Sequence, residues 1–161
     1  MRTWWQRLIA GICLVAMLLV AQPNAVWALA HDKQTLVKAD FSHQDLRDSD
    51  FSQSNMRDSN FRDSDLRGSR FFGTNLTRAD MTNIDLTGGA LDTARLTKTN
   101  LTNAILVGVF MTNTKFEGAI VDGADFTDVL LRRDQQLTLC KVAKGTNPKT
   151  GRNTRETLDC P

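Results

Sequence analysis

An apolar residue returns at every fifth position of this chain from Leu36 to Leu131. A period of five matches neither the repeat of about 3.6 residues in an α-helix nor the repeat of about two in a β-strand. All twenty positions in this frame are apolar, although only 41% of the chain is hydrophobic. Chance gives such a run with a probability on the order of 10⁻⁸, so the period is the strongest structural constraint in the sequence. We call these residues the central positions.

The residues around each central position also repeat. Two residues before it, the side chain is usually small, as at Ala39 and Ser49, although Gln44 and Ile84 depart from this rule. Two residues after it, Gly, Asp or Asn is common, and these residues tolerate positive φ or bond their own backbone. A large residue and a small one two places apart point to the same side of an extended segment. The pattern therefore predicts short straight sides joined by corners.

Four such sides close a coil of twenty residues, and successive coils stack at the inter-strand spacing of about 4.8 Å. The predicted fold class is an all-β solenoid, a right-handed quadrilateral β-helix with the central residues along its axis. Residues twenty apart should lie over one another, beginning with Phe41 on Phe61 and Phe51 on Phe71. Serine hydroxyls at the small inner positions should bond the backbone.

Individual five-residue units also resemble a known family. The segments "ADFSH" at 39–43, "ADMTN" at 79–83, "TNLTN" at 99–103 and "ADFTD" at 124–128 resemble the A(D/N)LXX unit of the pentapeptide repeat proteins. The resemblance covers about 39–133, or nineteen units. It implies the same square β-helix that the periodicity predicts.

The first thirty residues have the features of a secretory signal peptide. Arg2 and Arg7 precede an apolar run over 8–21, and "ALA" at 28–30 offers small residues at a cleavage site. We therefore predict cleavage between Ala30 and His31. A membrane anchor is the alternative, but fourteen apolar residues are short against the roughly 20 that span a bilayer.

Cleavage would change the composition of the mature chain. Loss of two arginines leaves 18 basic residues of the original 20, equal to the 18 acidic residues, and also removes all three Trp. A nucleic-acid binder typically carries a basic stripe, so a neutral chain argues against a nucleic-acid partner. We expect no stable membrane insertion after cleavage.

The tail after the repeat is predicted to be a helical cap. We divide the mature chain into a β-helix over 31–133 and a cap over 134–161, because open sheet edges aggregate unless they are covered. Asp134 is predicted to cap a first helix, and Asn153 with Glu156 resembles a capping box for a second. The segment "NPKTG" at 147–151 reads as a turn. The first helix is expected to contain the apolar or small residues Leu137, Leu139, Cys140, Val142 and Ala143.

Two cysteines, Cys140 and Cys160, remain in the predicted mature chain. An even number in an exported protein indicates a disulfide. Metal binding is the rival interpretation, and no His lies near either thiol in the sequence. The segment "LCKVAKGTNPKTGRNTRETLDC" at 139–160 is similar to the tail of pentapeptide repeat proteins of the thylakoid lumen in cyanobacteria and plants. With the signal peptide, this resemblance implies an exported cyanobacterial protein of the thylakoid lumen or periplasm.

The exterior is predicted to change along the rod. Asp45, Asp65 and Asp85 should stack, with Arg47 and Arg67 beside them, and we interpret them as a charge-balanced face rather than a cation site. Later coils replace such residues with apolar ones, which form the candidate interaction surface: Ile105, Phe110, Ile120 and Leu130. Phe110 and Leu130 should form one outward strip, which we expect the tail to cover; partner docking is the alternative.

No set of residues in the sequence has the pattern of an active site. His43 stands at a predicted corner, the aspartates face solvent, and a filled rod leaves no cleft, so we expect no catalytic residues, cofactor or metal. Two functional classes survive. The first is a non-catalytic scaffold or interaction module with an unknown protein partner, monomeric or weakly dimeric. The second is a redox-responsive protein that uses Cys140 and Cys160.

Overall fold

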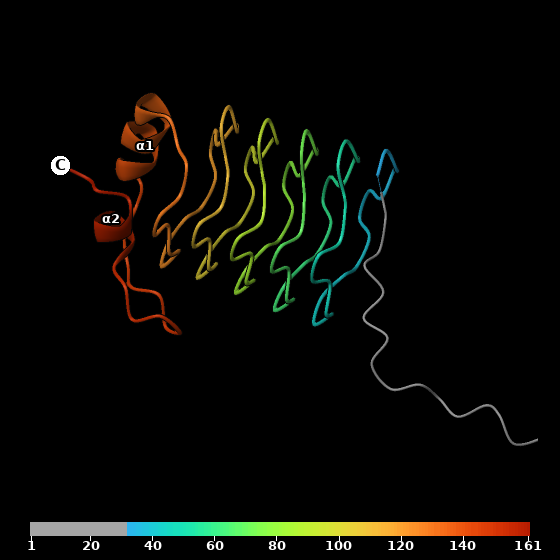
Figure 1. Ribbon diagram of the computed structural model, residues 1–161, viewed down its shortest axis with the longest axis horizontal. Helices are drawn as coiled ribbons and strands as arrows, with labels where there is room; N and C mark the ends of the chain where they lie inside the picture. Colours follow the sequence, from blue (N-terminus) through green and yellow to red (C-terminus); the bar gives the residue numbers. More distant parts are fainter. Residues whose placement is uncertain (1–31) are drawn as a thin grey trace, which may run out of the picture.

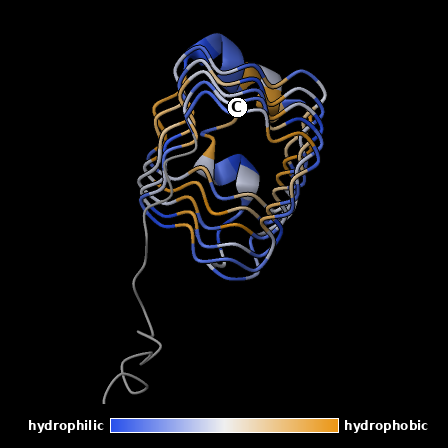
Figure 2. Ribbon diagram, turned by 90° about the vertical axis from the view of Figure 1, so that its right-hand side faces the viewer, coloured by the Kyte–Doolittle hydropathy of each residue, from blue (hydrophilic) through white to orange (hydrophobic). Residues whose placement is uncertain are grey.

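The computed structural model describes residues 32–161, so the predicted signal peptide and its cleavage site lie outside the described residues. The chain winds in stacked coils that form a rod, with the helical segments at one end (Figure 1). Viewed along the rod, the coils enclose a shared interior (Figure 2). The predicted right-handed quadrilateral β-helix with a helical cap is confirmed.

Adjacent coils pair in parallel, with a register of twenty residues. The bridges run from Thr35 with Asn55 to Phe110 with Leu130. Central residues donate their N–H along the rod, as Phe41 does to the carbonyl of Asn60 at 2.7 Å. Within 32–161 each side contributes an isolated bridge rather than a continuous strand. The reason is that two of every five residues form the turn.

Every corner from Lys33 to Asp128 has a positive φ, and the non-glycine corners lie between 56° and 60°. The Gly, Asn and Asp corners were predicted by their tolerance of this conformation. Lys98 and the β-branched Thr93 adopt it as well, at 58° and 57°. Their conformation is imposed by the coils above and below, not by their own preference.

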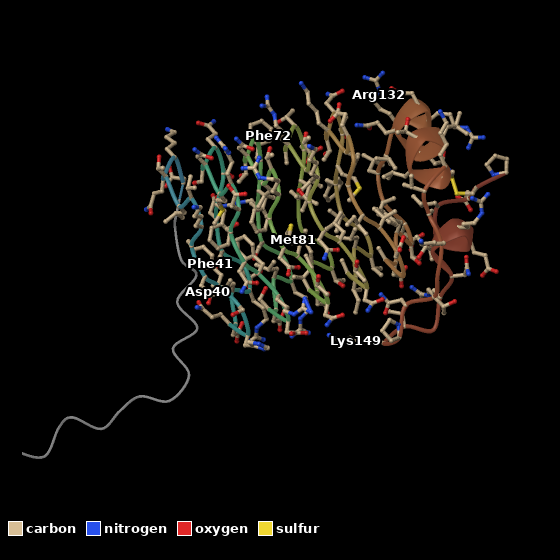
Figure 3. The ribbon with its side chains drawn as sticks, turned by 180° about the vertical axis from the view of Figure 1, so that it is seen from behind. Asp40, Phe41, Phe72, Met81, Arg132 and Lys149 are labelled. Carbon is tan, nitrogen blue, oxygen red and sulfur yellow. A yellow bond between two sulfur atoms is a disulfide. The ribbon has the colours of Figure 1, made fainter. Side chains whose placement is uncertain are left out.

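The central residues fill the axis. Phe41 stacks on Phe61 with ring centroids 5.0 Å apart, and Phe51 stacks on Phe71 at 4.9 Å. Met81 lies in the same interior (Figure 3) and has no exposed surface. The predicted stacking of residues twenty apart is therefore confirmed.

The small inner positions behave as expected. Hydroxyls there donate to backbone carbonyls, as from Ser69 to Leu46 at 2.6 Å and from Thr74 to Phe51 at 2.7 Å. Ile84, which departs from the small-residue rule, is fully buried in the core.

The cap contains two helices at the C-terminal end of the rod, α1 (Arg133–Cys140) and α2 (Thr154–Thr157) (Figure 1). The prediction that Asp134 caps the first helix is wrong. The cap residue is Arg132, whose N–H donates to the side chain of Gln135, while Asp134 lies inside the first turn.

The first helix also ends earlier than predicted. The chain turns after Cys140, because the N–H groups of Val142 and Ala143 both bond the carbonyl of Leu139. Val142 therefore lies outside the helix and is 53% exposed.

Other features of the tail are confirmed. Asn153 caps α2 by accepting from the N–H of Arg155, although Glu156 makes no return bond to Asn153. Asn147 closes the turn at 147–151 by accepting from the N–H of Lys149. The Cys140–Cys160 disulfide joins the end of α1 to the segment after α2, with Cα atoms 5.6 Å apart.

Candidate interaction surface

The rod has four sides, which we name by the central residues that stack within them. Side A runs from Phe41 to Val121, side B from Leu46 to Phe126, side C from Phe51 to Leu131, and side D from Leu36 to Phe116. On each side, the residue before the central one points outward and lies over its equivalent in the next coil.

The four predicted surface residues lie on three different sides. Phe110 and Leu130 are paired on side C and are 52% and 59% exposed. Ile120, on side A, is 48% exposed, whereas Ile105, on side B, is half-buried. Only Phe110 and Leu130 form a continuous surface, which we call the apolar strip.

The tail does not cover the apolar strip, so that expectation is wrong. The segment 144–153 instead follows the corner between sides A and B. The side-chain amide of Asn147 donates to the carbonyls of Asn103, at 3.1 Å, and Gly123, at 2.9 Å. Lys149 extends one coil further and reaches the carbonyl of Asn83 at 3.3 Å. In Figure 3, Lys149 and Phe72, which lies in the turn directly after side C, are at opposite edges of the rod.

Close backbone approach explains why the tail takes this corner. A Cβ on Gly145 would lie 3.1 Å from the backbone nitrogen of Gly123. The two glycines let the segments meet, and Gly123 donates its N–H to the carbonyl of Lys144 at 2.8 Å. The contact joins residues that are distant in sequence, and no local sequence pattern predicts it.

The coil that carries Phe110 is uncharged in this region, whereas Asp128 and Arg132 flank Leu130. Residues 104–112 contain no charged side chain. The neighbouring corners Gly88 and Gly108 have no heavy atom within 4 Å of where a Cβ would stand. Phe72, which is 48% exposed in the turn directly after side C, was not predicted from the sequence. The available signal was a second Phe directly after a central one.

The acidic column on side B is compensated as predicted. Arg47 bonds Asp45 at 2.6 Å and lies 3.7 Å from Asp65 in the next coil. Arg67 repeats the arrangement with Asp65 at 2.5 Å and Asp85 at 4.0 Å. The hydrogen bonds from these arginines hold the pKa of Asp45 and of Asp65 below the ordinary range. The geometry favours a charge-balanced face over a cation site.

Asp125 carries the buried charge of side B. Burial by itself raises its pKa, but hydrogen bonds from Thr127, supported by the positive charge of Arg152, outweigh that effect and lower it. Thr127 donates its N–H at 3.0 Å and its hydroxyl at 2.6 Å, and Arg152 lies 3.5 Å away. The tail thus supplies a cation to a fully buried carboxylate.

Residues 32–161 show neither a metal-binding cluster nor a membrane-spanning helix. Over this range no cluster of His, Cys, Asp or Glu has the arrangement needed to hold a metal ion. His43 is an exposed corner residue, with Nδ1 3.9 Å from a carboxylate oxygen of Asp63. No described helix has the length and apolar character to cross a bilayer.

These observations define the class of protein as a filled four-sided repeat solenoid whose distinctive feature is an exposed apolar strip. The profile of the "Pentapeptide repeats" family matches in eight copies, over residues 36–71, 58–88 and 94–133. The chain belongs to the pentapeptide repeat family.

Known relatives include proteins of the thylakoid lumen. A crystal structure of a pentapeptide repeat protein from the Arabidopsis thaliana thylakoid lumen is 49% identical and matches with a TM-score of 0.80. That match covers 81% of this chain and 90% of the other. A cyanobacterial pentapeptide repeat protein from Cyanothece 51142 shares the fold, with 19% identity over 65% of this chain and 82% of the other, and a TM-score of 0.58.

Two curated relatives match over shorter stretches. "Thylakoid lumenal 15 kDa protein 1, chloroplastic" from Arabidopsis thaliana is 60% identical over 47 residues, which are 29% of this chain and 21% of the relative. A second lumenal protein from the same plant, TL20.3, is 51% identical over 43 residues, or 27% of this chain and 15% of the relative. The matched segments thus span a minor part of the length of both relatives.

Proposed function

We propose that this protein is an exported, non-catalytic interaction module that binds a protein partner through the apolar strip. The observation that carries the proposal is the exposure of Phe110 and Leu130, at 52% and 59%, on neighbouring coils of side C. Contiguous exposed apolar surface rimmed by polar residues, here including Asp128 and Arg132, is typical of docking sites. Full burial of an exposed large side chain contributes about 1.5–3 kcal/mol, and because Phe110 and Leu130 are already about half buried, each would contribute about half of that in a complex.

The proposed location is the thylakoid lumen, with the periplasm as the alternative. Support comes from the lumenal relatives and from the N-terminal sequence pattern. Mass spectrometry of the mature protein tests the location through its N-terminus. Cleavage before His31 gives a chain without Trp or Tyr and almost no absorbance at 280 nm. A mature protein that retains Trp27 would contradict the proposed processing.

Affinity capture from a lumenal extract tests the interaction role. The tagged wild-type chain is compared with Phe110→Ser and with Phe72→Ser, which removes a similarly exposed Phe from the turn directly after side C, outside the strip. A partner captured by the wild type is then purified, and its affinity for all three proteins is measured. We expect Phe110→Ser to weaken binding by about three- to tenfold and Phe72→Ser to have little effect. Equal affinity for all three proteins would refute docking at the strip.

A redox role for the disulfide is the second candidate. The bond joins α1 to the chain end, so its reduction would release one cap helix from the other. A structural disulfide typically has a potential below about −300 mV, whereas a regulatory one lies higher. Equilibration of the wild-type protein with dithiol buffers of known potential distinguishes the two roles.

A further inference from the structure

We call the part of one coil that lies on one side of the rod a rung. The last two rungs of side C show which hydrogen bonds join neighbouring rungs there. Gly108 donates its N–H to the carbonyl of Thr127 at 2.9 Å. Val109 accepts at 3.1 Å from the N–H of Leu130, and Met111 donates at 3.2 Å to the carbonyl of Leu130. Two residues of the last coil, Thr127 and Leu130, thus form hydrogen bonds with three backbone groups of the coil beneath it.

On side C, the equivalent backbone groups of the last coil face the cap and have no hydrogen-bond partner among residues 32–161. The N–H groups of Asp128 and Leu131 and the carbonyl of Val129 make no hydrogen bond to any residue in 32–161. The cap does meet a backbone group of the last coil on each of the other sides, through the pairs Gln135 with Thr114, Lys144 with Gly123, and Thr157 with Phe126. Within the described range, backbone groups without a hydrogen-bond partner remain on other sides as well, such as the N–H groups of Phe116 and Gly118 on side D. Side C differs because no hydrogen bond from the described cap residues reaches Asp128–Leu131, and we call this stretch the free edge.

A cavity of about 270 Å³ lies over this free edge. Val129 and Leu131 line it from the rod, and Gln136 of α1 and Leu158 line it from the cap. Its volume lies below the range of roughly 300–1,000 Å³ that typically encloses a drug-sized ligand, so an occupant would place only part of its surface in the cavity and would run along the edge.

Charge indicates the chemistry of the occupant. Asp128 and Asp159 both line the cavity, and no cation lies within ion-pair distance of either among the described residues. The apolar strip ends beside the same edge, because Leu130 is the outward residue of this last rung. An occupant should therefore carry a basic side chain near Asp128 and an apolar one over Leu130.

We propose that the free edge at Asp128–Leu131 binds an extended peptide segment of a partner protein, which adds to the solenoid as one further rung. Strand addition of this kind uses main-chain hydrogen bonds for affinity and alternate side chains for specificity. The segment donates an N–H to Val129 and offers carbonyls to Asp128 and Leu131, as the last coil does for the coil beneath it. This inference deepens the proposed function and rests on it, because it extends the same strip.

The test uses a peptide copied from the rung itself. Acetyl-Thr-Lys-Val-Leu-Leu-amide repeats residues 127–131 with Lys in place of Asp, so that its Lys stands over Asp128. One control peptide retains the Asp, and another has Pro in the fourth place, which removes the N–H needed by Val129. Binding to the mature, disulfide-intact protein is followed by hydrogen exchange of individual amides. We expect the Lys peptide to slow exchange at Asp128 and Leu131 at least about tenfold.

Two protein variants test specificity without threatening the fold. Asp128→Lys is tolerated at this corner, since Lys38 and Lys98 occupy the same position with φ of 60° and 58°. We expect it to reverse the preference between the Lys and Asp peptides, each by up to about fivefold. Leu130→Ser alters a side chain that is already 59% exposed and should weaken both peptides.

The outcomes separate this inference from the function on which it rests. Equal binding of the Pro peptide, or unchanged exchange at Asp128 and Leu131 up to the solubility limit of the Lys peptide, would overturn the added rung. If capture is still sensitive to Phe110→Ser in that case, the docking role of the strip survives alone. Sedimentation equilibrium provides a further check. A wild-type dimer that Leu130→Ser converts to monomer would identify a second copy as the occupant and overturn the partner segment.

Discussion

The same substitution at two buried threonines should change stability in opposite directions. Thr114 lies inside the rod, 2% exposed, and its hydroxyl donates to the carbonyl of Leu91 at 2.7 Å. Thr154 lies at the start of α2 with no exposed surface, and its hydroxyl has no hydrogen-bond partner among the described residues. Replacement by Val removes one hydroxyl in each case and keeps the branched shape.

The magnitudes follow from what each hydroxyl does. Thr114→Val removes a buried hydrogen bond of about 1 kcal/mol, and Leu91 is not left unpaired because its carbonyl also accepts from Ala94 at 2.9 Å. Thr154→Val removes a buried hydroxyl whose desolvation is uncompensated, so the free energy of unfolding should rise by about 1 kcal/mol. The two variants should therefore differ by about 2 kcal/mol.

Urea unfolding of the mature protein, followed by far-UV circular dichroism, measures both changes. Equal slopes of free energy against urea would show that the variants and the wild type unfold over the same unit, and they are the condition for comparing midpoints. A change of the same sign in both variants would refute the assignment of hydrogen-bonded and unpaired hydroxyls.

Three further predictions follow from the cap, the corners and the buried charge. Cys140→Ser should lower the free energy of unfolding by about 3 kcal/mol, given a 20-residue separation, and reduced wild type should match it in thermal unfolding. Thr93→Asn should raise the free energy of unfolding by about 1 kcal/mol by relieving a β-branched residue at φ 57°. Thr97→Asn, at a turn residue without positive φ, should bring no gain in urea unfolding. The pKa of Asp125 is lowered from 3.8 by folding, so its stabilising effect is present above 3.8 and is lost as pH falls through the lower folded value. The urea midpoint should therefore fall below about pH 4, and less steeply in Asp125→Asn; an identical acid slope would contradict this reasoning.

Much of the rod could be predicted because its rules are local and repeated. Each unit contains a large apolar residue and a turn former at fixed spacing. One irregular residue, such as Ile84 at a small inner position, therefore does not hide the pattern, because the neighbouring units keep it. The stacking of Phe41 on Phe61 needed no knowledge of distant contacts beyond the period itself. The corner at Thr93 shows the limit, because its positive φ contradicts its own preference and is imposed by adjacent coils.

The candidate interaction surface, like the rod, could be predicted only in part. The sequence identified Phe110 and Leu130 as outward and aligned, since both follow from the period. It could not say which corner the tail would follow. That choice depends on contacts between Asn147 and Asn103, 44 residues apart, and between Lys149 and Asn83, 66 residues apart.

The five-residue period by itself determined the coil, its register and the filling of its axis, because each repeat meets the same physical demand as the one before it. Only the tertiary structure decided that the tail follows the corner between sides A and B, that Arg152 reaches the buried Asp125, and that side C keeps both an exposed strip and a free edge. The tail occurs once in the chain, so no repetition reveals its place. Its position is set by hydrogen bonds and close backbone contacts that form only after the rod exists.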